Sequence, residues 1–174
     1  MSFTLVGEDP ELTEAIERLA VLALPMGVEF TTADFGGVRT EADTVRILKY
    51  REDEYALYVK KLALKDPSAV PQPINEWRKI APFGKSMHNW GCARDLKPTR
   101  WPASKTFQWA HDQLDQLCET DPKLRGTLKL GDYFNDEPHI ELRVTLEEAR
   151  HRYIARLNAP AAPQASAKLS ENQV

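Results

Sequence analysis

The segment SMHNWGCARD, residues 86–95, combines two residue types that bind metal ions. His88 and Asp95 are seven positions apart, with Trp90 and Gly91 between them. An imidazole nitrogen and a carboxylate oxygen are both good ligands for zinc, and an ordinary surface loop has no need of this pair. We therefore interpret the segment as half of a metal site and look for a further ligand elsewhere in the chain.

The chain contains three other histidines. His111 and His151 fall in predicted helices among charged residues, so we expect both to face solvent. His139 follows a turn and opens the predicted strand HIEL, in which alternation sends His139 and Glu141 to one face. A catalytic zinc site typically has three protein ligands and one position open to water. One aspartate and two histidines meet this requirement: His88, Asp95 and His139.

Hydrolysis at such a site also needs a base, which takes a proton from water and returns it to the leaving group. Asp136 lies three residues before His139 in the predicted turn, and Glu137 is the competing choice. Arg39, between a predicted strand and helix, could stabilise an oxyanion or bind a substrate carboxylate. Spacing alone also allows a turn histidine, a capping aspartate and a surface arginine, because no contiguous zinc motif such as H-E-x-x-H is present.

Three segments resemble motifs of one family. SMHNWGCARDL resembles S-x-H-x-x-G-x-A-x-D-L, the main motif of zinc peptidases that cut bacterial cell-wall peptides. That family joins D-alanyl-D-alanine carboxypeptidases with L-alanyl-D-glutamate endopeptidases, which include many phage endolysins. DEPHIEL is similar to its second motif, D-x-P-H, and GGVRT to its S-G-Y-R-T element. Their order and rough spacing agree with the family over about residues 28–143.

The resemblance implies that zinc (Zn²⁺) is the cofactor and that its ligands are His88, Asp95 and His139. It also implies that Asp136 is the general base, that Arg39 is a catalytic or substrate contact, and that Ser86 binds substrate near the metal. Two positions depart from the family pattern: Gly36 stands in place of serine, and Val38 in place of an aromatic residue.

The D-x-P-H form of the second motif is more similar to the endopeptidases, so we expect a phage-type L-alanyl-D-glutamate endopeptidase acting on peptidoglycan stem peptides. The alternatives are a D-alanyl-D-alanine carboxypeptidase and a catalytically idle virion or structural module with the same fold. The first residues lack the positive charge and apolar run of a signal peptide. We therefore expect synthesis in the host cytoplasm and action on the cell wall, through holin-dependent release or as part of a virion.

Composition narrows the remaining classes of function. The net charge of −3 comes without a concentrated basic patch, which argues against nucleic acid as a partner. The longest apolar run, LAVLALPM, is far shorter than the roughly 20 residues of a spanning helix, so we expect no membrane anchor. Cys92 and Cys118 provide no disulfide framework, and strand alternation directs Cys92 away from Asp95 into the core. We expect a monomer.

The elements that must position these residues follow from periodicity and capping signals. Helices and strands alternate without regular βαβ units, which predicts the α+β class. With the resemblance, this implies a small antiparallel sheet flanked by helices, with zinc in a cleft on the sheet, as in hedgehog and DD-peptidase folds. One domain should span residues 1–158, followed by a flexible tail rich in Ala, Pro and Ser, residues 159–174. The predicted helices are 11–24, 40–66, 103–120 and 145–157, and the predicted strands are 28–35, 92–98, 126–130 and 139–144.

Two details of the long helix 40–66 complete the prediction. Its apolar stripe of Val45, Leu48, Tyr55, Tyr58 and Leu62 should face the core, with a break near Glu52. The proline-rich stretch 66–82 that follows should be a long loop with little regular structure.

Overall fold

A four-stranded antiparallel sheet organises the protein, with the strand order β1-β2-β4-β3. The computed structural model describes residues 7–33, 36–74, 81–131 and 139–159. All four predicted strands are present, and the predicted α+β class is confirmed. The strands are β1 (Glu29–Thr32), β2 (Ala93–Arg100), β3 (Leu128–Leu130) and β4 (His139–Leu142).

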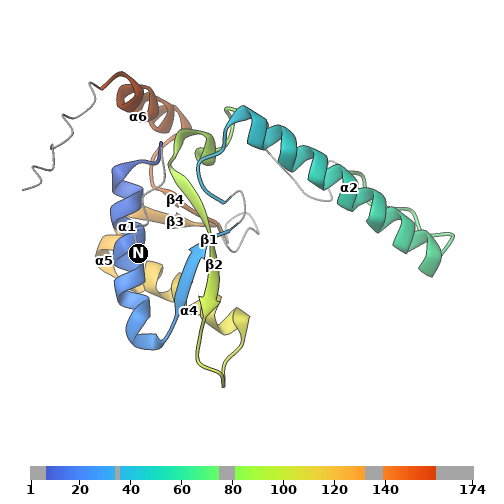
Figure 1. Ribbon diagram of the computed structural model, residues 1–174, viewed down its shortest axis with the longest axis horizontal. Helices are drawn as coiled ribbons and strands as arrows, with labels where there is room; N and C mark the ends of the chain where they lie inside the picture. Colours follow the sequence, from blue (N-terminus) through green and yellow to red (C-terminus); the bar gives the residue numbers. More distant parts are fainter. Residues whose placement is uncertain (1–6, 34–35, 75–80, 132–138, 160–174) are drawn as a thin grey trace, which may run out of the picture.

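Helices pack on this sheet or extend from it (Figure 1). Most of them begin where a side chain accepts a hydrogen bond from the first turn, as at Asp9, Thr40 and Thr145. These three starts agree with the sequence prediction. The helices are α1 (Pro10–Ala23), α2 (Glu41–Lys65), α4 (Phe107–Thr120), α5 (Pro122–Thr127) and α6 (Leu146–Asn158), with 3-10 turns η1 (Leu24–Met26) and η2 (Met87–Trp90).

Helix α5 was not predicted. Asp121 caps it by accepting hydrogen bonds from the backbone N–H groups of Lys123 and Leu124, and Pro122 occupies the first helical position. The helix takes up residues 126 and 127, so β3 is shorter than the predicted strand 126–130.

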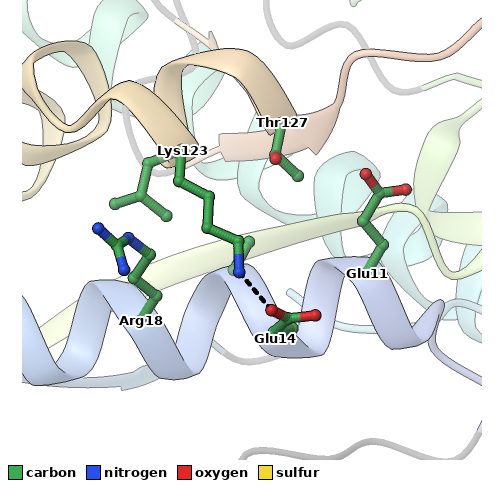
Figure 2. A pocket seen from close by; sticks show the side chains of 7 residues that line it. Glu11, Glu14, Arg18, Lys123 and Thr127 are labelled. Atoms are coloured by element: carbon green, nitrogen blue, oxygen red, sulfur yellow. Dashed lines mark hydrogen bonds and ion pairs between the residues drawn. The ribbon is translucent and has the colours of Figure 1, made fainter.

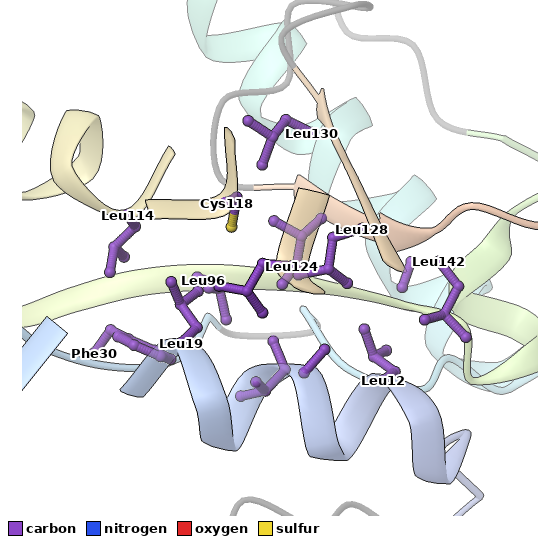
Figure 3. Packing of buried hydrophobic residues seen from close by; sticks show 14 of the residues in the cluster. Leu12, Leu19, Phe30, Leu96, Leu114, Cys118, Leu124, Leu128, Leu130 and Leu142 are labelled. Carbon is purple, nitrogen blue, oxygen red and sulfur yellow. The ribbon is translucent and has the colours of Figure 1, made fainter. Parts of the chain in front are cut away.

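The core lies between one face of the sheet and helices α1, α4 and α5 (Figure 3). Apolar residues at helical spacing in α1 meet the inward-facing side chains of the strands. The expectation that His111 faces solvent was wrong: this α4 residue is buried, whereas Phe107 on the same helix is 45% exposed. The core includes Leu12 and Leu19 of α1, Leu114 of α4, Leu124 of α5, and Phe30, Leu96, Leu128 and Leu142 of the sheet.

Helix α2 projects away from the sheet (Figure 1). It runs without the predicted break near Glu52, and its buried residue is Thr44. The predicted stripe therefore does not reach the core: Val45 is exposed, and the other four residues of the stripe are half-buried. The Tyr55 hydroxyl donates to the Gln72 carbonyl oxygen at 2.6 Å, so the chain returns beside the helix. Residues 66–73 form no helix or strand, as predicted for this loop.

Two further expectations concern a membrane-spanning helix and the C-terminal tail. None of the helices in the described ranges is both long and apolar enough to cross a membrane. Helix α6 ends at Asn158, and residues 160–174 of the predicted tail lie outside the described part of the chain, so the predicted end of the domain is not tested. The flexible tail therefore stays a prediction.

The segment before α1 is held tightly against the start of β2. The Asp9 N–H donates to the Gly91 carbonyl oxygen at 2.8 Å, and the Arg94 Nε–H donates to Glu8 Oε1 at 2.9 Å. Both side chains of the Arg94–Glu8 ion pair are almost fully buried. Removing one partner of such a pair is costly, because it leaves a buried charge uncompensated.

We predict that Gly91→Ala destabilises the protein. Gly91 has a φ of 69°, and an added Cβ would lie 2.2 Å from the Gly7 carbonyl oxygen. The left-handed conformation alone costs about 1–2 kcal/mol for an L-residue, and the clash with backbone adds to it. Thermal unfolding should show a Tm lowered by at least about 5 °C.

The matched control is Gly126→Ala in α5, where an added Cβ meets nothing within 4 Å. It should leave Tm unchanged or raise it, since alanine favours a helix over glycine. Equal Tm values for the two variants would contradict the proposed role of Gly91.

Candidate metal centre

The first candidate ligand, His88, is carried by the short turn η2. The Ser86 hydroxyl caps this turn by accepting from the His88 N–H at 3.3 Å. The Asn89 side-chain oxygen accepts from the N–H groups of Gly84 at 2.9 Å and Ser86 at 3.3 Å. Gly91 then ends the turn in a left-handed conformation. His88 is therefore held, fully buried, by hydrogen bonds within its own segment.

The other two candidate ligands are brought together by the sheet. β2 and β4 pair antiparallel, and in this register Asp95 lies directly opposite His139. Cross-strand neighbours share one face, so both side chains leave the sheet on the same side. The residues beside them, Arg94 and Ile140, point to the core face, where both are buried.

Three ligand atoms converge at this point. His88 Nε2 lies 3.0 Å from His139 Nδ1 and 3.1 Å from Asp95 Oδ1, and His139 Nδ1 lies 3.0 Å from Asp95 Oδ1. Tetrahedral zinc with bonds of about 2.0–2.1 Å would separate its ligand atoms by about 3.3 Å. The triangle needs only a slight expansion to hold such an ion. These three residues form the one group in the described ranges whose ligand atoms are close enough to share a metal.

Each candidate ligand also has a polar contact at the side-chain atom that faces away from the other two ligands. His88 Nδ1 lies 3.0 Å from the Gly37 carbonyl oxygen, and His139 Nε2 lies 3.1 Å from Glu141 Oε2. Asp95 Oδ2 accepts from Arg39 Nη2 at 2.6 Å. Such outer contacts set the tautomer and orientation of metal-binding histidines and carboxylates. The atoms left to face one another are the three of the triangle.

The electrostatics of the cluster favour positive charge between its members. Burial opposes the charged form of Asp95, but hydrogen bonds with His139 and His88 outweigh it, so the carboxyl pKa is lowered. Burial also opposes charge on His139, yet hydrogen bonds with Asp95 and Glu141 raise its pKa to about 9. For His88 burial dominates and lowers the pKa. The lowered carboxyl pKa and the raised imidazole pKa both show that the site stabilises a positive charge, which a metal ion supplies when it displaces the His139 proton.

The structure places the other predicted site residues as follows. Arg39 lies at the cluster, but the contact seen there is with Asp95; its predicted contact with substrate or an oxyanion stays a prediction. Ser86 lies two residues from His88 and caps its turn, and its predicted role in substrate binding likewise stays a prediction. Asp136 and the competing Glu137 lie outside the described residues, so the identity of the base is also still a prediction.

Sequence reasoning missed three supporting groups. Glu141 was expected on the same face as His139, yet no role was inferred for it. A carboxylate two residues after a histidine ligand in a strand is a usable signal for such support. The Gly37 carbonyl and Asn89, whose Nδ2 donates to the Arg39 carbonyl oxygen at 3.1 Å, left no such signal. Both act across more than 45 residues of chain.

A pocket elsewhere does not belong to this centre. It lies between α1 and α5, which cover the core face of the sheet (Figure 2). Asp95 and His139 leave the opposite face. Figure 2 shows Lys123 paired with Glu14 at the edge of the pocket. Arg18 is bound to Asp121, so these polar groups already satisfy one another.

Comparison with known proteins gives a fold but no close relative. No family model matches the sequence, and no curated protein is significantly similar to it. One similar solved structure is VanYB in complex with D-alanine-D-alanine, with a TM-score of 0.52 and 20% identity, covering 86% of this chain and 78% of that one. Another is a mutant of the vancomycin resistance D,D-pentapeptidase VanY in complex with Zn(II). It has the same TM-score and identity and covers 84% of this chain and 78% of that one. This protein has the fold of the VanY structures, as the DD-peptidase-like expectation required.

Proposed function

We propose that this protein is a zinc-dependent peptidase that hydrolyses peptidoglycan stem peptides. The observation that carries the proposal is the buried triangle of His88, Asp95 and His139, whose ligand atoms lie 3.0–3.1 Å apart. Two histidines and one carboxylate are a ligand set of catalytic zinc enzymes. The VanY fold adds support, since one VanY structure contains Zn(II) and the other contains a D-alanyl dipeptide.

In this proposal His88 Nε2, Asp95 Oδ1 and His139 Nδ1 hold the ion. When bound, Zn²⁺ supplies Lewis-acid chemistry, polarising a carbonyl group and making water acidic enough to deprotonate near neutral pH. Asp136 accepts the proton of the attacking water and passes it to the departing amine. Arg39 holds Asp95 so that one carboxylate oxygen stays directed at the ion.

The scissile bond distinguishes two versions of the proposal. We favour a D,D-carboxypeptidase, which removes the terminal D-alanine, because a protein of the same fold binds D-alanine-D-alanine. The L-alanyl-D-glutamate endopeptidase expected from the sequence is the second candidate, supported by the D-x-P-H form of the second motif. The phage-lysin type, holin-dependent release, a place in a virion, synthesis in a host cytoplasm and a monomeric state stay predictions from the sequence.

The first prediction concerns the metal. The purified protein should contain one zinc per chain, and His88→Ala should lose it, because two ligands cannot hold the ion tightly at a site built for three. Elemental analysis after dialysis measures the zinc content. Asp95→Asn is a second variant with less change in packing, and it should also lose most of the zinc.

The matched control is His151→Ala, since His151 is an exposed histidine on α6. It should retain one zinc per chain. Stoichiometric zinc in folded His88→Ala protein would show that the site is wrongly assigned.

The second prediction concerns the base. Asp136→Asn should keep its zinc but lose about 10²–10⁴ in turnover, because an amide cannot accept the proton of water. Glu137→Gln should be milder, since the resemblance to the D-x-P-H motif gives the role of the base to Asp136. The measurement is hydrolysis of peptidoglycan at equal zinc content. If Glu137→Gln is inactive and Asp136→Asn is active, the two assignments must be exchanged.

The third prediction concerns the bond. Mass spectrometry of muropeptides digested with the zinc-loaded protein should show loss of the terminal D-alanine from pentapeptide stems, and a chelator should abolish it. Cleavage between L-alanine and D-glutamate would instead establish the second candidate. Intact muropeptides after digestion with zinc-loaded protein would support the idle module.

A further inference from the structure

An ion pair of Glu141 and Lys129 lies next to His139, on the side away from the other two candidate ligands. Glu141 Oε2 contacts His139 Nε2 at 3.1 Å, while Glu141 Oε1 accepts from Lys129 Nζ at 3.0 Å. Each carboxylate oxygen thus has its own partner. The Glu141 side chain is 13% exposed and that of Lys129 is 39% exposed, so the pair runs from the buried ligand toward solvent.

The strand register explains why these groups meet. Glu141 lies opposite Lys129 on β3 and opposite Ala93 on β2. All three share the sheet face of the metal site, and His139 is two residues before Glu141 on that face. Ala93 carries only a methyl group, which leaves Glu141 room beside the ligand. The sheet therefore builds the contact from three strands.

The contact has a chemical consequence for His139. A neutral imidazole can offer Nδ1 to a metal only when its proton is on Nε2. An ionised carboxylate only accepts hydrogen bonds, so Glu141 at Nε2 selects that tautomer. A carboxylate in this position also increases the basicity of the ligand nitrogen. The ammonium of Lys129 holds the other oxygen of Glu141 and keeps the carboxylate against the ring.

His88 is supported differently, because its outer nitrogen meets the backbone carbonyl of Gly37. A side-chain substitution cannot remove that acceptor. Of the two histidine ligands, His139 is thus the one whose orientation depends on a replaceable side chain.

We propose that Glu141, held in place by Lys129, is a positioning residue that fixes the tautomer and orientation of His139 and thereby sets the metal affinity of the site. The inference rests on the zinc site of the proposed function. It adds two residues from β3 and β4 that take part without touching the ion.

The test compares Glu141→Leu, Glu141→Gln and Lys129→Met with wild type. The zinc Kd is measured by competition with a chromophoric chelator, and the absorption spectrum of the Co²⁺-substituted protein reports ligand geometry. Loss of a supporting carboxylate typically weakens metal binding about 10–100-fold. Glu141→Leu should lie at the upper end of that range with an altered Co²⁺ spectrum. Glu141→Gln should lie at the lower end, since its amide oxygen still accepts from Nε2–H, and Lys129→Met should show the smallest loss.

Glu119→Gln is the matched control, an exposed carboxylate on α4, the helix that packs on the core face of the sheet. It should bind zinc as wild type does. A general loss of stability would lower Tm without changing the Co²⁺ spectrum, so the spectrum separates positioning from packing. If Glu141→Leu does not fold, the Glu141→Gln protein decides the matter.

The role of Glu141 would be overturned if the Glu141→Leu protein had the zinc Kd and the Co²⁺ spectrum of the wild type. The same result in Glu141→Gln would overturn it if the leucine variant does not fold. That result leaves the zinc site intact as long as His88→Ala has lost its zinc. Failure of the wild-type protein to bind zinc would instead contradict the proposed function itself.

Discussion

The register of β2 against β4 is the constraint on which the rest of the site depends. It places Asp95 opposite His139, although the two residues are 44 positions apart in the chain. A slip of one residue would turn His139 into the core and bring Ile140 to the metal face. The core prevents this slip, because Ile140 and Leu142 are buried among the apolar side chains beneath α1 and α5. Packing on one face of the sheet thus positions the chemistry on the other.

The third ligand comes from outside the sheet and needs its own anchors. His88 lies on η2, and its carbonyl oxygen accepts from the Arg39 N–H at 3.1 Å, which connects the turn to the start of α2. On the other side, Gly91 lets the chain pass within contact of residues 7 and 8 before it enters β2. The ion pair of Arg94 with Glu8 fixes that crossing from the core side. Residues far from the metal face therefore determine where the first ligand lies.

Charges alternate along the metal face of the sheet. Arg39 binds Asp95 at one end, and Lys129 binds Glu141 at the other, with His139 between the two carboxylates. Buried charges are tolerated when each has a partner of opposite sign. A divalent ion inside the triangle would continue the alternation, since it would lie between Asp95 and the histidine supported by Glu141. The same pairs that make the buried charges tolerable also hold the candidate ligands in position.

Local signals in the sequence determined the class of fold, most helix starts and the candidate ligands. A capping side chain acts on the next turn of its own helix, as Asp9, Thr40 and Thr145 do, so neighbouring residues are enough to predict it. The ligand types His and Asp, and the placement of His139 and Glu141 on one strand face, likewise follow from local order. Tertiary structure alone decided two pairings. Glu141 meets Lys129 through the register of β4 against β3, and Arg39 meets Asp95 across 56 positions of the chain. Tertiary structure also buried His111 and exposed Phe107, since helix periodicity defines a stripe but not which edge of it meets the sheet.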